Sequence, residues 1–338
     1  MELLERFLKY VKIPTMSSEE SNTIPSTIKQ FDLASVLVDD LKELGLENIK
    51  LTDKCIVYAF LPSNANSKKN IGFIAHMDTS PEASDTFIKP NIINNYDGKT
   101  IKLANGVTIN PIEFPSLNSQ IGHTLITTDG NTLLGADDKA GIAEIMDMLK
   151  YFKDNPDILH HNICIAFTPD EEVGEGTTSF DLKEFNADFA YTVDGGKFDE
   201  FSYECFNAAS ASIKITGVGI HPGEAKDKMV NAARIGIEFD TLLPANKRPE
   251  YTNKYEGFNH LTSINGNEVE TTLSYILRNH DSDELKKQKN EFKAIVELLK
   301  TKYPKAKINL EIKDSYTNMK YDILKHPEVI DLAINFYS

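Results

Sequence analysis

The chain has 338 residues, enough for two domains, and its content of 41% hydrophobic and 26% charged residues is typical of a globular protein. The formal net charge of −15 argues against nucleic-acid binding that ignores base sequence, because such binding depends on Lys and Arg. Three cysteines do not suggest a disulfide framework, and no apolar stretch is long enough for a membrane span. The N-terminus lacks the pattern of a signal peptide, so we expect a cytoplasmic protein.

The first part of the chain predicts helices followed by strands. Helices are expected over residues 3–12 and 26–44, where apolar residues recur near helical spacing, and strands over 56–61 and 71–75. From residue 81 to 124 the pattern weakens, and Asn, Asp, Gly and Pro punctuate short apolar pieces. We expect a long excursion over one face of the domain.

A second helix-and-strand series begins at residue 137. A helix with an apolar face and good helix formers follows Asp137, and strands are expected over 163–167 and 189–193. Strands that alternate with helices predict an α/β domain with a mostly parallel central sheet and helices on both faces.

The pattern changes near residue 206. The expected order is strand, helix, two strands around the turn at Asn265, helix and strand, which is the ferredoxin-like α+β unit. These elements are expected over residues 210–215, 229–243, 261–264, 268–277, 283–303 and 307–312. We therefore predict a first catalytic segment over 1–206, an inserted lid and dimerisation domain over 207–315, and a returning catalytic segment over 316–338.

Polar clusters follow four apolar runs in the first 200 residues. They read IGFIAHMD, LLGADDKAG, FTPDEEVGEG and YTVDGG, and each places His, Asp or Glu just beyond a segment that resembles a buried strand. Ligands of open α/β sheets gather at the carboxyl ends of the strands. Four such ends with imidazole and carboxylate donors suggest one dinuclear metal centre.

Each cluster also has an ordinary explanation when taken alone. A His and an Asp two residues apart are common in turns, the Glu171–Glu172 pair suits a solvated face, and Asp194 before two glycines suits a plain turn. These explanations account poorly for all four clusters at once. A dinucleotide-binding domain is also disfavoured, because no G-x-G-x-x-G opens a helix after the first strand.

The clusters, in this order and spacing, resemble those of the M20 family of dinuclear zinc peptidases. The likeness extends from LLERFLKYV at the start to FNAASASIKITGVGIHPGEAKDKMVNA and DSYTNM near the end. The resemblance implies two Zn²⁺ per subunit, small peptide substrates and release of the N-terminal residue from tripeptides by attack of a zinc-bridging water. The implied roles are: His76 and Asp194 on one zinc, Asp137 bridging, Glu172 on the second zinc, Glu171 as general base, and Asp78 on the other His76 nitrogen.

The chemistry of these residues agrees with the roles that the resemblance implies. Zinc takes His nitrogen and carboxylate oxygen, and two metals can share a bridging carboxylate and a bridging water. A free carboxylate such as Glu171 must accept the proton of that water and pass it to the leaving amine. A carboxylate on the second His nitrogen, as expected for Asp78, fixes the tautomer of the ligand.

Two residues of the predicted lid are candidates for substrate binding. The resemblance implies that His221 reaches a neighbouring active site in a homodimer and that Arg278 binds the substrate carboxylate. The ordinary alternatives are a polar loop residue before Pro222 and a surface arginine. A bidentate guanidinium suits a free peptide carboxylate, which favours the functional interpretation of Arg278.

The sequence departs from the family pattern at its end. Family members continue for several tens of residues, with a Gly-rich turn and a terminal His on the second zinc, and neither occurs here. We therefore expect a C-terminally truncated chain whose second zinc is one protein ligand short. The alternatives are another M20 amidohydrolase, such as a dipeptidase or an N-acyl amino-acid deacylase, and an inactive fragment that only binds metal or dimerises.

Overall fold

The structure is a computed structural model that describes residues 1–196 and 200–337. The chain divides near residue 198 into two compact units. The domain boundaries predicted at residues 206 and 315 stay predictions. Within the described ranges, no helix has the length and apolar character needed to cross a bilayer.

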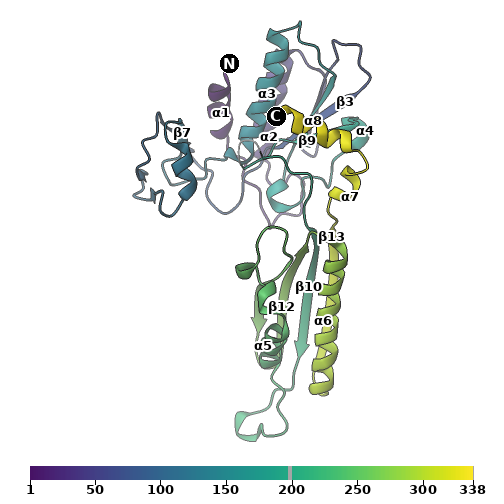
Figure 1. The fold of residues 1–338 in the computed structure, drawn as a ribbon. Helices are drawn as coiled ribbons and strands as arrows, with labels where there is room; N and C mark the ends of the chain where they lie inside the picture. Colours follow the sequence, from purple (N-terminus) through teal and green to yellow (C-terminus); the bar gives the residue numbers. More distant parts are fainter. Residues whose placement is uncertain (197–199, 338) are drawn as a thin grey trace. The chain divides into compact units, whose positions relative to one another are not determined.

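The first unit is built on a mixed sheet with the strand order β1-β2-β8-β3-β9 (Figure 1). Strands β3, β8 and β9 run parallel, whereas β1 and β2 are antiparallel to their neighbours. The predicted parallel arrangement therefore holds for the three strands that precede polar clusters, and the antiparallel β1–β2–β8 side makes the whole sheet mixed. The strands are β1 Glu47–Leu51, β2 Val57–Leu61, β3 Asn70–His76, β8 Asn162–Thr168 and β9 Phe189–Thr192.

Helices cover both faces of this sheet. One face packs against α1 (Leu3–Val11), α2 (Gln30–Leu44) and α3 (Ala136–Asp154), which together form the larger core. The other face packs against the short α4 (Leu182–Phe185), through Phe185, and a smaller core. Alternate residues of β2 and β8 point into the two cores, as the two-residue period of a strand requires.

Helix α2 begins four residues later than the sequence predicted. Residues 26–29 are not helical, and the Ser26 backbone N–H and hydroxyl donate to the carboxylate of Asp170 instead. The helix ends at Gly45, whose φ of 86° is the left-handed conformation typical of a helix C-terminus. Tertiary hydrogen bonds thus shorten the helix at its start, and local backbone chemistry ends it.

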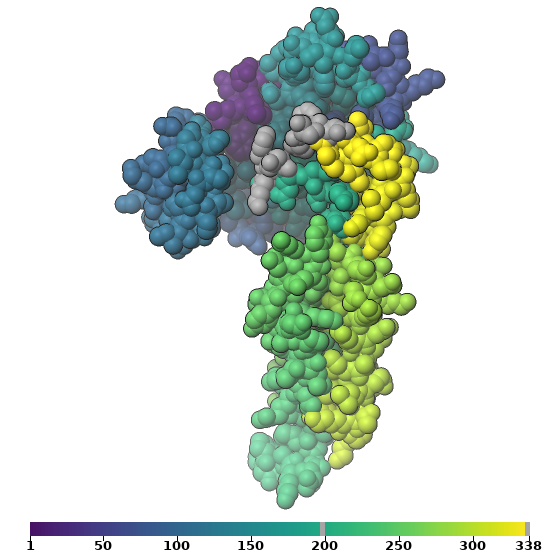
Figure 2. Space-filling view, in the orientation of Figure 1, coloured from purple at the N-terminus to yellow at the C-terminus, as the bar shows by residue number. Residues whose placement is uncertain are grey.

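The predicted excursion contains two small antiparallel pairs and one short helical turn. Strand β4 (Asn91–Ile93) pairs with β7 (Leu125–Thr127), and β5 (Ile101–Lys102) pairs with β6 (Thr108–Ile109). Pro115–Gln120 is a 3₁₀ helix. In Figure 2 this segment forms a lobe of the first unit, seen in blue. Its entry is anchored by Asp85, whose carboxylate lies 2.8 Å from the Lys29 ammonium.

The second unit contains a four-stranded antiparallel sheet with the order β11-β12-β10-β13. Together with helices α5 and α6 this confirms the predicted ferredoxin-like order. The core between sheet and helices includes the packed rings of Phe239, Tyr275 and Phe292. The elements are β10 Asn207–Thr216, α5 Ala232–Leu242, β11 Phe258–Gly266, β12 Glu270–Asn279, α6 Ser282–Lys302, β13 Lys307–Tyr316, α7 Lys320–Ile323 and α8 Pro327–Tyr337.

Candidate metal centre

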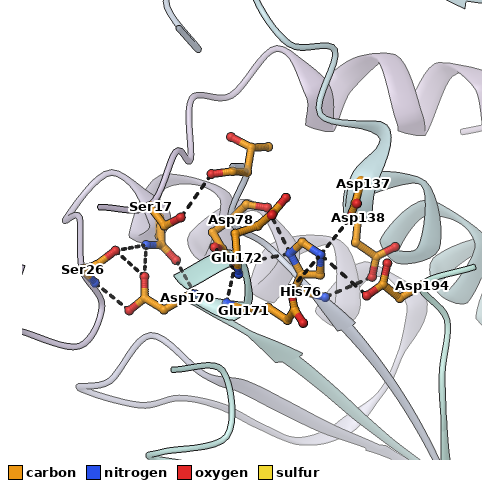
Figure 3. A network of polar contacts seen from close by, with 12 residues as sticks. Ser17, Ser26, His76, Asp78, Asp137, Asp138, Asp170, Glu171, Glu172 and Asp194 are labelled. Carbon is orange, nitrogen blue, oxygen red and sulfur yellow. Dashed lines mark hydrogen bonds and ion pairs between the residues drawn. The ribbon is translucent and has the colours of Figure 1, made fainter. Parts of the chain in front are cut away.

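His76, the last residue of β3, is the centre of the polar network in Figure 3. Its side chain is only 2% exposed. Its Nδ1 lies 3.1 Å from the carbonyl oxygen of Asp78 and 3.3 Å from the carboxylate of the same residue. Its Nε2 lies 2.8 Å from Asp137 and 3.8 Å from Asp194. One nitrogen therefore faces an orienting partner, and the other faces the carboxylates of the centre.

The acidic residues come from two further elements. Asp137 lies at the start of α3, and Asp194 follows the end of β9. One ligand atom each of His76, Asp137 and Asp194 lies within 4.8 Å of the others, which makes them a group able to hold one metal ion. A histidine and two carboxylates are a donor set that zinc accepts. The geometry thus fits a metal at this place, and the ligand roles stay predictions.

A glycine in α3 allows the two acidic segments to come together. A Cβ atom on Gly141 would lie 1.8 Å from the backbone carbonyl oxygen of Val193, a distance that no side chain can adopt. The first turn of α3 therefore packs directly against the chain that leads into Asp194. This close approach brings the helix that follows Asp137 against the residue that precedes Asp194.

Glu171 and Glu172 lie on a single 3₁₀ turn, Glu171–Val173, that follows β8. The backbone N–H groups of Glu171 and Glu172 donate to the two carboxylate oxygens of Asp78, at 3.0 and 3.2 Å. Asp78 therefore contacts both His76 and the turn, whereas the sequence predicted only the first contact. Glu171 Oε2 lies 3.9 Å from His76 Nε2. Glu172 is outside the metal-holding group found among the described residues.

The carboxylates of the centre are crowded, and their pKa values show it. Burial and the charge of Asp194 raise the pKa of Asp138 to about 8. Partial burial and neighbouring carboxylates also raise the pKa values of Glu171 and Asp194, although His76 opposes the increase. Burial lowers the pKa of His76, but Asp78 and other acids outweigh this and raise it to about 10. A bound cation would relieve such crowding.

Two buried acids at the site were missed by the sequence analysis. Asp138 accepts the backbone N–H of His76 at 3.1 Å and that of Gly141 at 3.3 Å, so it joins β3 to α3. Asp170 is fully buried and has a φ of 58° just before the turn of Glu171. Each stands next to a predicted ligand or base in the sequence, and adjacency was the only available signal. Burial separates their roles from those of their neighbours.

A cavity of about 470 Å³ opens beside the centre within the first unit. His76, Glu171 and Asp194 contribute to its wall, and the apolar part of the wall includes Ile74, Phe180 and Leu182. The cavity places apolar surface next to the predicted base, as ligand pockets commonly do.

The two predicted substrate-binding residues lie on the second unit. His221 is exposed, and its Nδ1 accepts the N–H of Gly223 at 3.2 Å. Arg278 is half-buried near the end of β12, where its guanidinium lies 5.5 Å from the ring centre of Tyr316. These contacts do not test the predicted roles, which stay predictions.

Comparisons with known proteins agree on one family. The family described as "Peptidase dimerisation domain" matches residues 203–305. Peptidase T of Alkaliphilus oremlandii is 49% identical over 336 residues, covering 98% of this chain and 82% of that protein. Peptidase T of Caldanaerobacter subterraneus is 50% identical with the same coverage of both chains.

Solved structures show the same fold. The aminopeptidase PepT from Bacillus cereus matches with a TM-score of 0.71 at 21% identity, and a tripeptidase from Staphylococcus aureus with a TM-score of 0.71 at 22% identity. Each match covers 94% of this chain and 76% of the other. With the sequence identity to the curated relatives, these likenesses place the chain in the peptidase T family of M20 peptidases.

Proposed function

We propose that the protein is a metal-dependent aminopeptidase that releases the N-terminal residue of tripeptides. The observation that carries the proposal is the group of His76, Asp137 and Asp194 with Glu171 beside it, in a chain that is 49% identical to a named peptidase T. The metal is proposed to be zinc, with two ions per subunit. His76 and Asp194 would hold the first ion, Glu172 the second, and Asp137 both.

Two bound metal ions would lower the pKa of a water molecule between them and polarise the carbonyl of the scissile bond. Asp78 holds the His76 ring through Nδ1, so Nε2 is presented to the centre in one orientation. Asp138 fixes the backbone of His76 and the start of α3 relative to each other. These contacts keep the donor atoms in place before substrate arrives.

Glu171 is the proposed general base. Its carboxylate takes a proton from the attacking water while the water oxygen bonds to the carbonyl carbon. It then delivers that proton to the leaving nitrogen as the C–N bond breaks, so one water is consumed and a free amino acid and a dipeptide form. The side chain is 55% exposed, which leaves room for it to reach first the attacking water and then the leaving nitrogen.

The second unit is proposed to bind substrate and to dimerise. Its likeness to a peptidase dimerisation domain supports a homodimer. Arg278 would pair with the carboxylate of the peptide, and His221 would reach the centre of the partner subunit. We also propose a cytoplasmic location, because Cys55, Cys164 and Cys205 are all free thiols.

The first test measures zinc and turnover on the same protein. Elemental analysis after dialysis gives zinc per folded chain, and an unblocked tripeptide, its N-acetylated form, a dipeptide and an N-acyl amino acid serve as substrates. We expect bound zinc, release of one free amino acid from the unblocked tripeptide only, and loss of turnover with a chelator that zinc reverses. Hydrolysis of the N-acyl amino acid instead would favour the other M20 amidohydrolases, and zinc without any turnover would favour a protein that binds metal without catalysis.

A further inference from the structure

We infer that Gln30 and Ser26, which lie outside the metal centre, are positioning residues for Glu171 and Glu172 and act through the buried carboxylate of Asp170. The inference rests on the proposed function for the roles of Glu171 and Glu172. The contacts themselves do not depend on it. They join the start of α2 to the turn after β8, and part of this network appears in Figure 3.

The hydrogen bonds of Asp170 occupy both of its carboxylate oxygens. Oδ2 accepts the backbone N–H of Ser26 at 2.6 Å, and Oδ1 accepts the Ser26 hydroxyl and the Gln30 side-chain amide at 2.5 and 2.7 Å. The backbone N–H of Asp170 donates in return to Oε1 of Gln30 at 3.3 Å. Asp170 and Gln30 are both 0% exposed. The pair is thus reciprocal and shielded from water, where each lost hydrogen bond is costly.

This pair holds the backbone from which the two functional acids project. Asp170 adopts φ 58° and ψ 28°, and the chain then enters the 3₁₀ turn of Glu171 and Glu172. Asp78 holds the same turn through the N–H groups of residues 171 and 172. The turn is therefore fixed at two places, by Asp78 on the side of His76 and by Gln30 with Ser26 on the side of α2.

The side chain of Glu171 cannot fix its own direction by packing. Glu171 is 55% exposed, so its orientation is set mainly by the backbone beneath it. A small rotation of the turn would move the proposed base and the proposed ligand Glu172 together. Misplacement of a catalytic group by about 1 Å can cost about 100-fold in rate.

The left-handed backbone alone does not require this arrangement. An Asn or Gly at position 170 would adopt the same φ, so a purely conformational role needs neither a buried carboxylate nor its donors. A merely structural role predicts that variants lose stability while folded protein keeps its metal affinity and turnover. A positioning role predicts loss of metal affinity and kcat in protein that remains folded.

The variants separate these possibilities. Gln30→Met keeps the volume of the side chain and removes its hydrogen bonds, and Asp170→Asn leaves an amide facing the Gln30 amide. The double variant Gln30→Glu with Asp170→Asn places the carboxylate at position 30 and the amide at position 170. The amide can then donate to the carboxylate, as in the unchanged pair but in the opposite direction. Tyr10→Phe is the matched control, because Tyr10 is fully buried in the same unit and donates to the buried carboxylate of Asp40 at 2.7 Å.

Three readouts are taken on each variant. They are urea unfolding without metal, cobalt(II) affinity followed by visible absorption, and kcat and KM on a tripeptide. For Gln30→Met and Asp170→Asn we expect cobalt affinity to fall by about 10- to 100-fold, as for other residues that support metal ligands. We expect kcat to fall at least tenfold with KM nearly unchanged. The double variant should recover most of the cobalt affinity and most of kcat.

The control variant should be less stable but bind cobalt like the unchanged chain. The inference is overturned when folded Gln30→Met binds cobalt with unchanged affinity, or when the double variant recovers stability alone. If the unchanged chain hydrolyses no tripeptide, the proposed function fails, and cobalt affinity still decides the role of the Gln30–Asp170 pair.

Discussion

The two sheets of the molecule differ in where their polar groups lie. In the second unit, β10 pairs with β12 from Asn207 to Thr216 without a register shift, and aromatic rings fill the core between sheet and helices. In the first unit, the parallel strand β3 ends at buried His76 and β8 leads into buried Asp170, while buried Asp138 lies at the start of α3. Buried polar groups cost free energy unless each finds a partner.

This difference indicates which part of the chain carries the chemistry. The sheet of the second unit is antiparallel throughout and packs a mostly apolar core against α5 and α6, although it also buries Asn207 and Asn259. In the first unit, charged side chains are buried at one end of the parallel strands. Hydrogen bonds from neighbouring residues stabilise the buried carboxylates of Asp138 and Asp170. Such local departures from ordinary burial are expected at functional sites.

The largest expected effect comes from the proposed base. Glu171→Gln should lower kcat by about 10²- to 10⁴-fold, because the amide cannot accept the proton of the attacking water. Zinc content should not change, since Glu171 is outside the metal-holding group. Steady-state kinetics and elemental analysis check this. Glu175→Gln on the same loop is the control and should keep kcat within about twofold, and normal turnover by Glu171→Gln would remove the base from the mechanism.

The second prediction concerns the core of the other unit. Phe292→Ala should lower the free energy of unfolding by about 3–5 kcal/mol, because it removes a fully buried ring that packs against Phe239 and Tyr275. Urea unfolding measures the loss, and Phe292→Leu should lose less. Zinc per folded chain should stay the same. A folded Phe292→Ala protein without zinc would contradict the separation of roles between the units.

Two helical glycines allow a matched comparison between the units. Gly141→Ala should cost about 3 kcal/mol and weaken metal binding, because its Cβ would meet a backbone carbonyl at 1.8 Å. Gly236→Ala in α5 should change stability by less than about 1 kcal/mol, because its Cβ would come too close only to the end of the Leu273 side chain, at 2.9 Å, and alanine favours the helix. Thermal unfolding and zinc titration test both. Equal effects would show that the approach of α3 to Val193 has no special role.

The sequence was informative where periodicity and burial coincide. Apolar runs predicted β3, β8 and β9, and the ferredoxin-like order followed from alternating strands and two helices. Strand β1 was missed, because ENIKL is polar and lies at a sheet edge with mostly exposed side chains. The pairing of β4 with β7 was missed because the partners are separated by a long irregular segment. Long-range pairing of short strands leaves no local pattern.

The residue pattern alone predicted the residue types of the candidate site, whereas their roles were predicted only through the family likeness. The four clusters and the family likeness identified His76, Asp137 and Asp194, which the structure brings together. The residue pattern alone could not separate Asp137 from Asp138, since both follow the same glycine, and only the family likeness pointed to Asp137; in the structure they differ in exposure and in contacts. It also could not identify Gln30, whose partner Asp170 lies 140 residues away. Such roles depend on burial and tertiary contacts.

The smallest expected effect contrasts two buried acids of the first unit. Crowding raises the pKa of Asp138, whereas Asp85 has a cation partner. Burial raises the pKa of Asp85, but Lys29 and the Met16 N–H outweigh this and hold it below its ordinary value. Because the folded pKa is the lower one, Asp85 stabilises the fold above its unfolded pKa of about 4 and loses this contribution as the pH falls through the folded pKa.

Asp85→Asn should therefore cost about 1–3 kcal/mol near pH 7, where the charged hydrogen bonds to Lys29 are present. The cost should shrink steadily below about pH 4, as the native carboxylate takes up its proton. Urea unfolding of both proteins across this range measures the difference. A cost that does not change with pH would mean that Asp85 acts through shape and not through charge. The excursion would then be held against the rest of the first unit by packing. Asp85 and Asp138 would then not differ in how their charge affects stability.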